Sequence, residues 1–211
     1  MKLYGSETSP YVRKVRIVIK EKAIPCEFIV EGPGDAAGNV AALNPLSKVP
    51  VLLRDAGDVL FDSPMIVEYL DSIQGDPLLP PVGEVRWVVQ RWHALGQGIL
   101  EAVIARMMEG RKPIEKQMQE VIAKQEAKVA AALKYADAHL KHADAAKKGA
   151  NYLVNDRFSL ADIALGVALE YIDMRYAQDW RGKYPRLAQW QAGMAKRPAF
   201  IETMPPEMRK V

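Results

Sequence analysis

Apolar and polar positions follow two different periods in the first third of the chain, and the period changes several times. Short apolar or alternating runs between glycine- and proline-rich breakers predict strands, whereas apolar positions three and four residues apart predict helices. The predicted elements are a strand, a helix, a strand, a loop with one helical turn near its end, a β-hairpin and a helix, at residues 2–5, 9–23, 26–31, 32–44, 49–62 and 63–73. This order predicts an α/β domain over residues 1–75.

From residue 84 onward the pattern is helical, and no run there predicts a strand. Helices are predicted at residues 84–109, 113–142, 158–173 and 184–197, with a short helix after Pro198. Ser159 precedes Asp162 by three residues, which is close to a capping box and favours a structural role for both. We therefore predict an all-helical domain over residues 86–211, joined to the first domain by a proline- and glycine-rich linker at residues 76–85.

The composition is that of an ordinary soluble globular protein, and 211 residues are enough to bury a substantial core. The formal net charge of +3 is modest, and Lys and Arg are interspersed with acids. A nucleic-acid binder usually shows a basic stripe, whereas this chain has one local basic cluster, Arg13, Lys14 and Arg16. We expect this cluster to face solvent on the first helix, and we expect no nucleic-acid partner.

Membrane association and disulfide bonding are also disfavoured. No run approaches the roughly 20 apolar residues that a helix needs to cross a bilayer, and the opening residues lack the apolar core of a secretory signal. We therefore expect a cytoplasmic protein with no membrane partner. The one cysteine, Cys26, excludes an intramolecular disulfide and any multi-cysteine zinc site, and its apolar neighbours favour a buried thiol.

The three histidines do not form a metal-site pattern. His139 and His142 are spaced as neighbours on a helix, but two histidines without a third ligand favour surface positions over a metal site. His93 lies within a predicted helix, where packing is the favoured role. The sequence contains neither a phosphate loop nor a Ser-His-Asp arrangement, and we expect no metal cofactor.

Five short motifs carry more information together than any one of them does. They are, in order, SPY at the first helix, NPLSKVPVL, FDSPMIVEYL, DPLLPP in the linker and FSLADIAL in the helical part. In this order and spacing the chain resembles the cytosolic glutathione transferases over nearly its whole length, and especially bacterial glutathione transferase-like proteins with serine at the first helix. The resemblance implies a thioredoxin-like N-terminal domain, a helical domain for the second substrate, glutathione as co-substrate, and a homodimer that uses faces of SPMIVEYL and RWVVQRW.

The resemblance places the sulfur of glutathione near Ser9. A cysteine thiol has a pKa of about 8.5, so little of it is thiolate at neutral pH, and a hydroxyl that donates to the sulfur favours the anion. The positive end of the helix dipole would add to this effect. Ser9 would then be a hydrogen-bond donor and not a nucleophile. Since Ser-Pro begins many helices, the alternative is that Ser9 only caps the helix.

Other donors near Ser9 remain open as well. Tyr4, Ser6 and Thr8 are close in sequence, and a tyrosine of the first strand region serves in many relatives. Tyr11 is expected to lie against the site or the core.

The motif KVPVL supplies the second set of contacts by resemblance. It implies a cis Pro50, which turns Val49 so that its N–H and C=O meet the cysteinyl moiety of glutathione. Lys48 would reach the glycyl carboxylate as a point charge, and a solvated loop lysine is an equally open role. Relatives often have glycine where this chain has Ser47, which leaves the loop geometry open.

The motif FDSP supplies the third set. Ser63 is placed to cap the following helix, and Pro64 fits the first helical position. By resemblance, the Ser63 hydroxyl and N–H would bind the γ-glutamyl carboxylate at the helix N-terminus. Asp62 would pair with the γ-glutamyl ammonium or orient it.

The second-substrate pocket is expected in the helical domain, together with Tyr11. Its candidates near the end of a long helix are Arg106, Met107 and Met108, and a later helix adds Tyr171 and Arg175. Core packing is the alternative for the methionine pair, because methionine fills irregular gaps.

The sequence is compatible with two functions. The first is a glutathione transferase that activates the thiol for attack on small electrophiles, peroxides or disulfides. The second is a non-catalytic glutathione-fold module that works in binding or stress response. Thiol transfer through an enzyme cysteine is disfavoured, because Ser9 stands where glutaredoxins and omega-like transferases have that cysteine.

Overall fold

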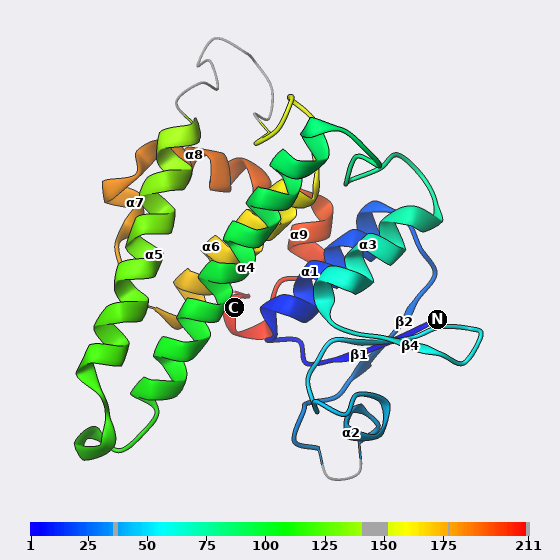
Figure 1. Cartoon of the computed structure of the whole chain (residues 1–211), viewed down its shortest axis with the longest axis horizontal. Coiled ribbons are helices and arrows are strands. Elements are labelled where there is room, and N and C mark those ends of the chain that lie inside the picture. The colour runs from blue at the N-terminus through cyan, green and yellow to red at the C-terminus, as the bar shows by residue number, and fades with distance from the viewer. Residues whose placement is uncertain (36–37, 141–151, 177, 210–211) are drawn as a thin grey trace. The chain divides into compact units, whose positions relative to one another are not determined.

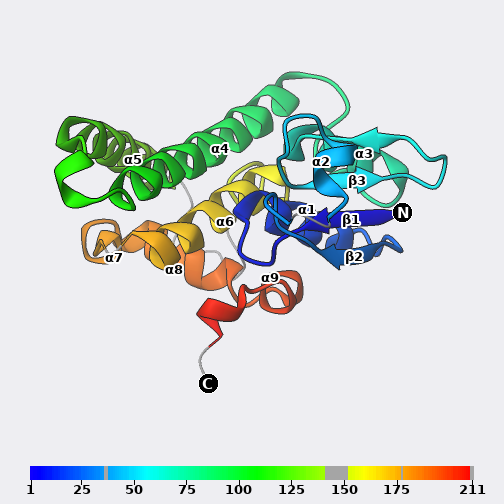
Figure 2. The same ribbon diagram turned by 90° about the horizontal axis from the view of Figure 1, so that it is seen from below.

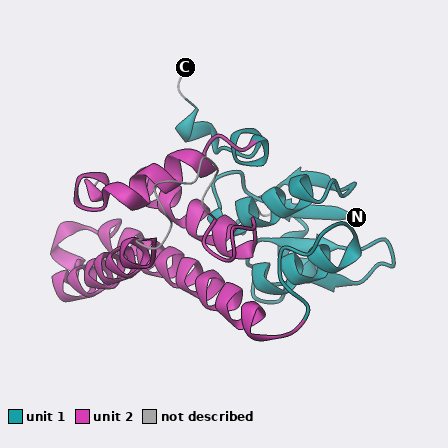
Figure 3. Ribbon diagram, turned by 90° about the horizontal axis from the view of Figure 1, so that it is seen from above, with its two compact units in different colours: residues 1–81, 198–211 teal, residues 82–197 magenta. Residues whose placement is uncertain are grey.

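The computed structural model describes residues 1–35, 38–140, 152–176 and 178–209, and the chain forms two compact units (Figure 3). The first unit comprises residues 1–81 and 198–211, and the second comprises residues 82–197. The predicted helical domain therefore ends earlier than residue 211. Its last residues belong to the first unit because α9 packs against α1 there.

The first unit contains a four-stranded mixed sheet with helices, in the predicted thioredoxin-like order (Figures 1 and 2). Its elements are β1 (Lys2–Gly5), α1 (Pro10–Glu21), β2 (Glu27–Val30), α2 (Val40–Leu43), β3 (Val51–Leu53), β4 (Val59–Leu60), α3 (Ser63–Ile73), α9 (Pro198–Glu202) and the 3-10 turn η3 (Pro206–Met208). The strand order across the sheet is β2-β1-β3-β4. Cys26 lies just before β2 and is half-buried, so the prediction of a buried thiol is wrong.

The strand directions determine where the helices begin. β1 and β4 both pair antiparallel with β3, so β1 and β4 run in the same direction. α1 follows β1 and α3 follows β4, and the two helices pack against each other. Both helices therefore begin at the edge of the sheet where β1 and β4 end. β3 begins at that same edge, since its first residue Val51 pairs with Tyr4 near the end of β1.

Two of the three residues of the basic cluster on α1 are buried and Arg16 is half-buried, so the prediction that the cluster faces solvent is wrong. Arg13 and Lys14 are only 2% and 1% exposed. The Arg13 guanidinium donates to the carbonyl of Phe200 at 3.2 Å and lies 5.8 Å from the centre of that ring. Arg16 lies 4.4 Å from the ring centre of Phe28 in β2. The flat guanidinium group stacks on aromatic faces, so these arginines are covered by the sheet and by the C-terminal segment.

Two helix starts also differ from the prediction. Asp62 occupies the cap position of α3, so Ser63 is the first helical residue rather than the cap. In the second unit, a 3-10 turn at Ile114–Lys116 precedes α5, which begins at Gln119 instead of residue 113. The Glu109 carboxylate stabilises this entry by accepting the Met118 N–H at 2.8 Å.

The named elements of the second unit are all helices, and the part of the unit that the structure describes also has an isolated antiparallel bridge between Val154 and Arg157. Its elements are α4 (Glu84–Gly110), η1 (Ile114–Lys116), α5 (Gln119–His139), α6 (Leu160–Arg175), α7 (Trp180–Lys183) and α8 (Pro185–Met194). α6 is its central helix, because residues 160–172 are all buried and α6 packs against both α4 and α8. Gly96 lets α4 approach α6 closely, since a Cβ there would lie 2.7 Å from the Ala164 backbone.

The predicted capping box at the start of α6 is confirmed. Ser159 Oγ accepts from the Ala161 N–H at 3.3 Å, and Asp162 accepts from the Ser159 N–H at 2.9 Å and from its hydroxyl at 3.0 Å. The other Asp162 oxygen accepts from the Leu153 N–H at 2.8 Å. Burial raises the pKa of Asp162 to about 6, although these hydrogen bonds act in the opposite direction.

The histidines lie in different surroundings. His139 is exposed and its ring stacks on Tyr135 at 3.9 Å, His93 is buried in α4, and His142 lies outside the described residues. Within the described ranges, no group of three His, Cys, Asp or Glu side chains is placed to hold a metal ion. No helix in those ranges is long and apolar enough to cross a membrane.

Candidate functional site

Three segments that are far apart in the sequence meet at one edge of the sheet in the first unit. They are the loop between β1 and α1, the segment that precedes β3, and the turn between β4 and α3. These segments carry all the residues that the sequence assigned to glutathione, namely Ser9, Lys48, Val49, Pro50, Asp62 and Ser63. The strand directions bring them together, because two strands end and one begins at this edge.

The same edge carries the N-termini of α1 and α3. The first N–H groups of a helix have no partner within the helix, and the helix dipole places partial positive charge at this end. Two such ends at one edge favour a negatively charged ligand.

Ser9 occupies the cap position of α1. Its Oγ accepts a hydrogen bond from the Val12 N–H at 3.4 Å, and the residue is half-buried. A hydroxyl has one donor hydrogen besides its acceptor lone pairs, so capping leaves the Ser9 O–H able to donate to a ligand. Capping and donation are therefore compatible at this residue.

The neighbouring candidates are placed differently. Tyr4 is buried in an apolar cluster with Val40 and Val51, so its side chain contributes to the core. Ser6 and Thr8 are half-buried in the loop before α1. Tyr11 is half-buried on α1 itself. Among these residues Ser9 alone occupies the cap position of the helix, where the dipole supports a nearby anion.

The peptide bond between Val49 and Pro50 is cis, as predicted. Val49 is half-buried, Pro50 is buried and Lys48 is exposed. Ser47 has φ +50°, a left-handed conformation in which glycine is unstrained. The left-handed backbone at Ser47 thus defines the loop geometry that the sequence left open.

Asn44 shapes this loop and was missed by the sequence reasoning. It is buried, its side-chain amide donates to the Lys48 carbonyl at 2.9 Å, and its Oδ1 accepts from the Leu46 N–H at 3.0 Å. The side chain thus fixes the backbone directly before Val49. The available signal was the dipeptide Asn44-Pro45, which favours a turn in which the Asn side chain bonds to the backbone.

Asp62 and Ser63 lie at the start of α3 and differ in burial. Asp62 is exposed with an extended backbone, and the peptide bond between Phe61 and Asp62 is also cis. Ser63 is the first residue of α3 and is only 2% exposed. The Asp62 carboxylate can bind an ammonium group, and the N-terminus of α3 can bind a carboxylate group. The free amino and carboxylate groups of an amino acid present this pair.

The second-substrate candidates lie on separate elements. Arg106, Met107 and Met108 follow one another on α4, with Met108 exposed, whereas Tyr171 is buried in α6. Arg106 Nε donates to Glu126 at 2.7 Å, and its guanidinium lies 4.3 Å from the ring centre of Tyr176.

Tyr176 was missed by the sequence reasoning and has a shifted pKa. Burial raises the pKa of its phenol, and the nearby Glu126 carboxylate adds to the effect. Arg106 is thus a positioned group in a cluster with an acid and a phenol. No local sequence pattern links these residues, because they come from three different helical regions.

Comparison with known proteins follows the same division of the chain. The family model described as glutathione S-transferase, N-terminal domain, matches residues 3–78, and the model described as glutathione S-transferase, C-terminal domain, matches residues 119–191. The chain is 36% identical over 211 residues to the uncharacterized GST-like protein YibF of Escherichia coli, covering 98% of this chain and 100% of that protein.

Two solved structures are also similar over almost the full length. A glutathione S-transferase from Methylobacillus flagellatus with glutathione bound is 43% identical, with a TM-score of 0.90 over 97% of this chain and 98% of the other. A glutathione S-transferase from Methylobacterium radiotolerans in complex with glutathione sulfonate is 33% identical, with a TM-score of 0.88 over 100% of this chain and 96% of the other.

Proposed function

The chain belongs to the glutathione S-transferase family, and we propose that it is an enzyme that binds glutathione and activates its thiol. The observation that carries this proposal is the meeting of Ser9, the cis Val49–Pro50 segment and Asp62–Ser63 at one sheet edge with two helix N-termini. Glutathione is an anion with an amino-acid end and a thiol, so its groups match what this edge offers. The glutathione and glutathione sulfonate bound by the two similar structures support the same ligand.

Each part of the edge has a role in the proposal. Val49 holds the cysteinyl moiety through its backbone N–H and C=O. Asp62 and Ser63 hold the γ-glutamyl ammonium and carboxylate, and Lys48 reaches the glycyl carboxylate. Ser9 donates its hydroxyl hydrogen to the sulfur.

The donation by Ser9 lowers the pKa of the bound thiol. A hydrogen bond to a charged acceptor contributes about 1.5–3 kcal/mol, which corresponds to roughly one to two pKa units. The positive end of the α1 dipole acts in the same direction. The thiolate then attacks a small electrophile, a peroxide or a disulfide.

Tyr11, Arg106, Met107, Met108 and Tyr171 are proposed to contribute to binding of the second substrate. Arg106 is the polar member of this set, and its contacts to Glu126 and Tyr176 hold the guanidinium in place. We also propose that the protein acts in the cytoplasm as a homodimer in detoxification. Exposed apolar side chains on α3 and α4, including Met65 and Trp87, favour such a contact.

Calorimetric titration with glutathione tests the proposal, followed by turnover assays with halogenated aromatic, isothiocyanate, peroxide and mixed-disulfide substrates. We expect saturable binding and turnover on at least one class. Binding without turnover on any class would favour the non-catalytic module. Absence of binding would overturn the glutathione site itself.

A further inference from the structure

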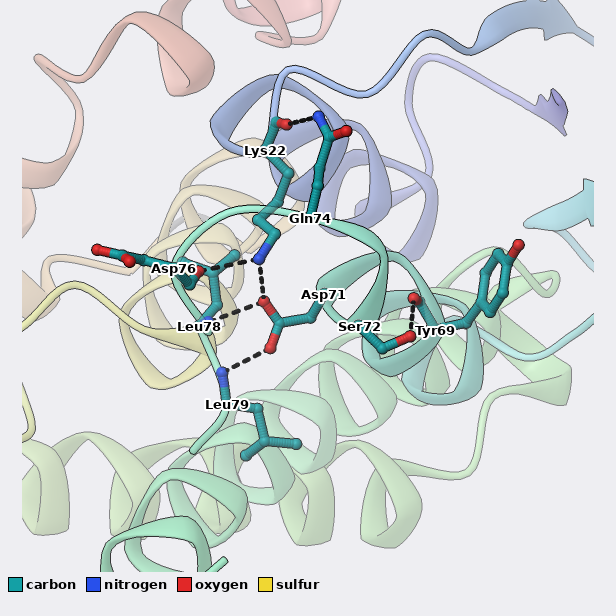
Figure 4. A network of polar contacts seen from close by, with 8 residues as sticks. All are labelled: Lys22, Tyr69, Asp71, Ser72, Gln74, Asp76, Leu78 and Leu79. Carbon is teal, nitrogen blue, oxygen red and sulfur yellow. Dashed lines mark hydrogen bonds and ion pairs between the residues drawn. The ribbon is translucent and has the colours of Figure 1, made fainter. Parts of the chain in front are cut away.

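Helices α1 and α3 are joined at the ends that lie away from the candidate site. Lys22 follows the last residue of α1 as its C-cap, and Asp71 lies in the last turns of α3. Lys22 Nζ donates to Asp71 Oδ1 at 2.9 Å (Figure 4). The side chains are only 2% and 6% exposed, so this is a buried ion pair.

Both charged groups of the pair form further hydrogen bonds. Lys22 Nζ also donates to the Asp76 carbonyl at 2.9 Å. Asp71 accepts from the Leu78 N–H at 2.8 Å through Oδ1 and from the Leu79 N–H at 2.9 Å through Oδ2 (Figure 4). Charge-assisted hydrogen bonds are strong, so several of them hold each charged group in one preferred position.

A second link connects the same two helix ends. The Gln74 side-chain amide, directly after α3, donates to the Lys22 carbonyl at 2.6 Å and to the Ala23 carbonyl at 3.2 Å. The end of α3 is therefore attached both to the side chain and to the backbone at the end of α1.

The opposite ends of these helices carry Ser9 and Ser63. The two helices run in the same direction, because they follow parallel strands and pack against each other. An α-helix rises about 1.5 Å per residue and is stiff over two or three turns. A sliding of α3 along α1 at the Lys22–Asp71 end would therefore move Ser63 relative to Ser9 by a similar distance.

Net stability is a weak reason for such a pair. The free energy needed to remove two charges from water nearly cancels the free energy gained from their attraction and hydrogen bonds. Replacement of a buried ion pair by apolar residues is therefore often neutral or stabilising. A buried pair does fix the local geometry, because either charge would be strongly destabilising if it were buried without its partner.

We propose that Lys22 and Asp71 are positioning residues for glutathione: they fix the axial offset of α1 and α3, and thereby the distance from Ser9 to Ser63. This inference rests on the proposed function, in which Ser9 meets the sulfur and Ser63 meets the γ-glutamyl carboxylate. Glutathione spans both groups with one peptide backbone, so it binds well only when that distance is held. In enzymes, a misplacement of the reacting groups by about 1 Å can lower the reaction rate by about 100-fold.

The test uses the double variant Lys22→Met/Asp71→Asn of the full chain. It removes both charges, and the amide oxygen of the introduced asparagine can still accept from one of the two linker N–H groups, those of Leu78 and Leu79. We expect the Kd for glutathione to rise about tenfold and the thiol of bound glutathione to titrate closer to its free value. A merely structural role would change the unfolding midpoint and leave both readouts unchanged in the folded protein.

The matched control is Lys20→Met on the same helix. Lys20 pairs with Glu202 at 2.7 Å, but this pair is half-exposed and connects α1 to α9, not to α3. Its loss should leave the Kd and the thiol titration unchanged. The conservative variant Lys22→Arg keeps the buried charge and should restore most of the affinity that Lys22→Met loses.

The outcomes separate this inference from the proposed function. Wild-type protein that does not bind glutathione overturns both. Wild-type binding, together with a folded double variant that has an unchanged Kd and thiol titration, overturns the positioning role alone. If the double variant does not fold, the surface variant Gln74→Ala decides: a Kd about threefold higher supports the inference, and an unchanged Kd overturns it.

Discussion

Ser9 Oγ accepts a hydrogen bond from the Val12 N–H at 3.4 Å, so the residue that we propose as the thiol donor is also the cap of α1. The two roles use different parts of one hydroxyl, since the lone pair serves the helix and the hydrogen serves the ligand. They therefore predict different losses when the hydroxyl is removed.

Ser9→Ala should produce both losses at once. Loss of the cap should lower the free energy of unfolding by about 0.5–2 kcal/mol. Loss of the donor should raise the pH at which bound glutathione forms thiolate by roughly one to two units, measured by ultraviolet absorbance. Turnover at neutral pH should fall about tenfold or more.

Binding of S-methylglutathione is the control for this variant. A thioether requires no donor, so its Kd should stay near that of the wild-type protein. An unshifted thiolate titration with retained activity would reduce Ser9 to a cap and assign the donor role elsewhere.

Ser9→Cys should give the protein a gain of thiol-transfer activity. A cysteine at the start of α1, whose thiolate the helix dipole would favour, would attack a disulfide formed between glutathione and a small thiol. The attack would form the enzyme–glutathione disulfide and release the small thiol, and a second glutathione would then restore the cysteine and leave as oxidised glutathione. The measurement is glutathione-dependent reduction of a small disulfide. No gain in a folded variant would argue against the assigned geometry of Ser9 and the sulfur.

Ser63→Ala should raise KM for glutathione more than it lowers kcat. The hydroxyl is proposed to bind the γ-glutamyl carboxylate, away from the sulfur, so it contributes to binding in the ground and transition states alike. A useful control is Ser72→Ala on the same helix, where the exposed hydroxyl donates to the Tyr69 carbonyl at 2.7 Å. A Ser63→Ala protein with normal KM and a collapsed kcat would contradict the assignment.

Asp162 should make stability fall as pH rises. Burial raises its pKa from 3.8 to about 6 in the folded protein, so the folded state keeps a proton that the unfolded chain has lost. The stability that this proton provides is fully present below the unfolded pKa and is lost as pH rises through about 6. Between about pH 4 and pH 7 the loss should be about 2 kcal/mol.

Urea unfolding of the wild-type protein and of Asp162→Asn over this pH range isolates the effect. The difference between the two unfolding free energies should change with pH, the wild type losing stability relative to the variant towards high pH, because only the wild type has the titrating carboxyl. Parallel curves would show that Asp162 is ionised throughout.

The homodimer can be tested by light scattering after size exclusion. We expect a mass about twice the 23.5 kDa of the chain at micromolar concentration. Trp87→Arg should shift this mass towards that of the monomer, because Trp87 is 64% exposed on the proposed contact face. Ile114→Arg, at an even more exposed apolar residue outside that face, should not. A monomeric wild-type protein would exclude this assembly.

The sequence alone determined the features that depend on neighbouring residues. The order of strands and helices follows from apolar periodicity, and the start of α6 follows from Ser159 and Asp162, which are three residues apart. The motif that contains Val49 and Pro50 allowed the cis bond to be predicted by resemblance. For the element order and the capping box, a short window of sequence contains the whole cause, whereas the cis bond needed the resemblance as well.

Tertiary structure decided the features whose partners are distant. A charged α1 face looks solvent-exposed in sequence, yet Arg13 is buried because Phe200, 187 residues later, accepts its hydrogen bond. The pairing of Lys22 with Asp71 across 49 residues is likewise invisible to periodicity. The physical reason is that periodicity reports only whether a side chain is polar, whereas burial of a charge depends on which distant segment supplies its partner.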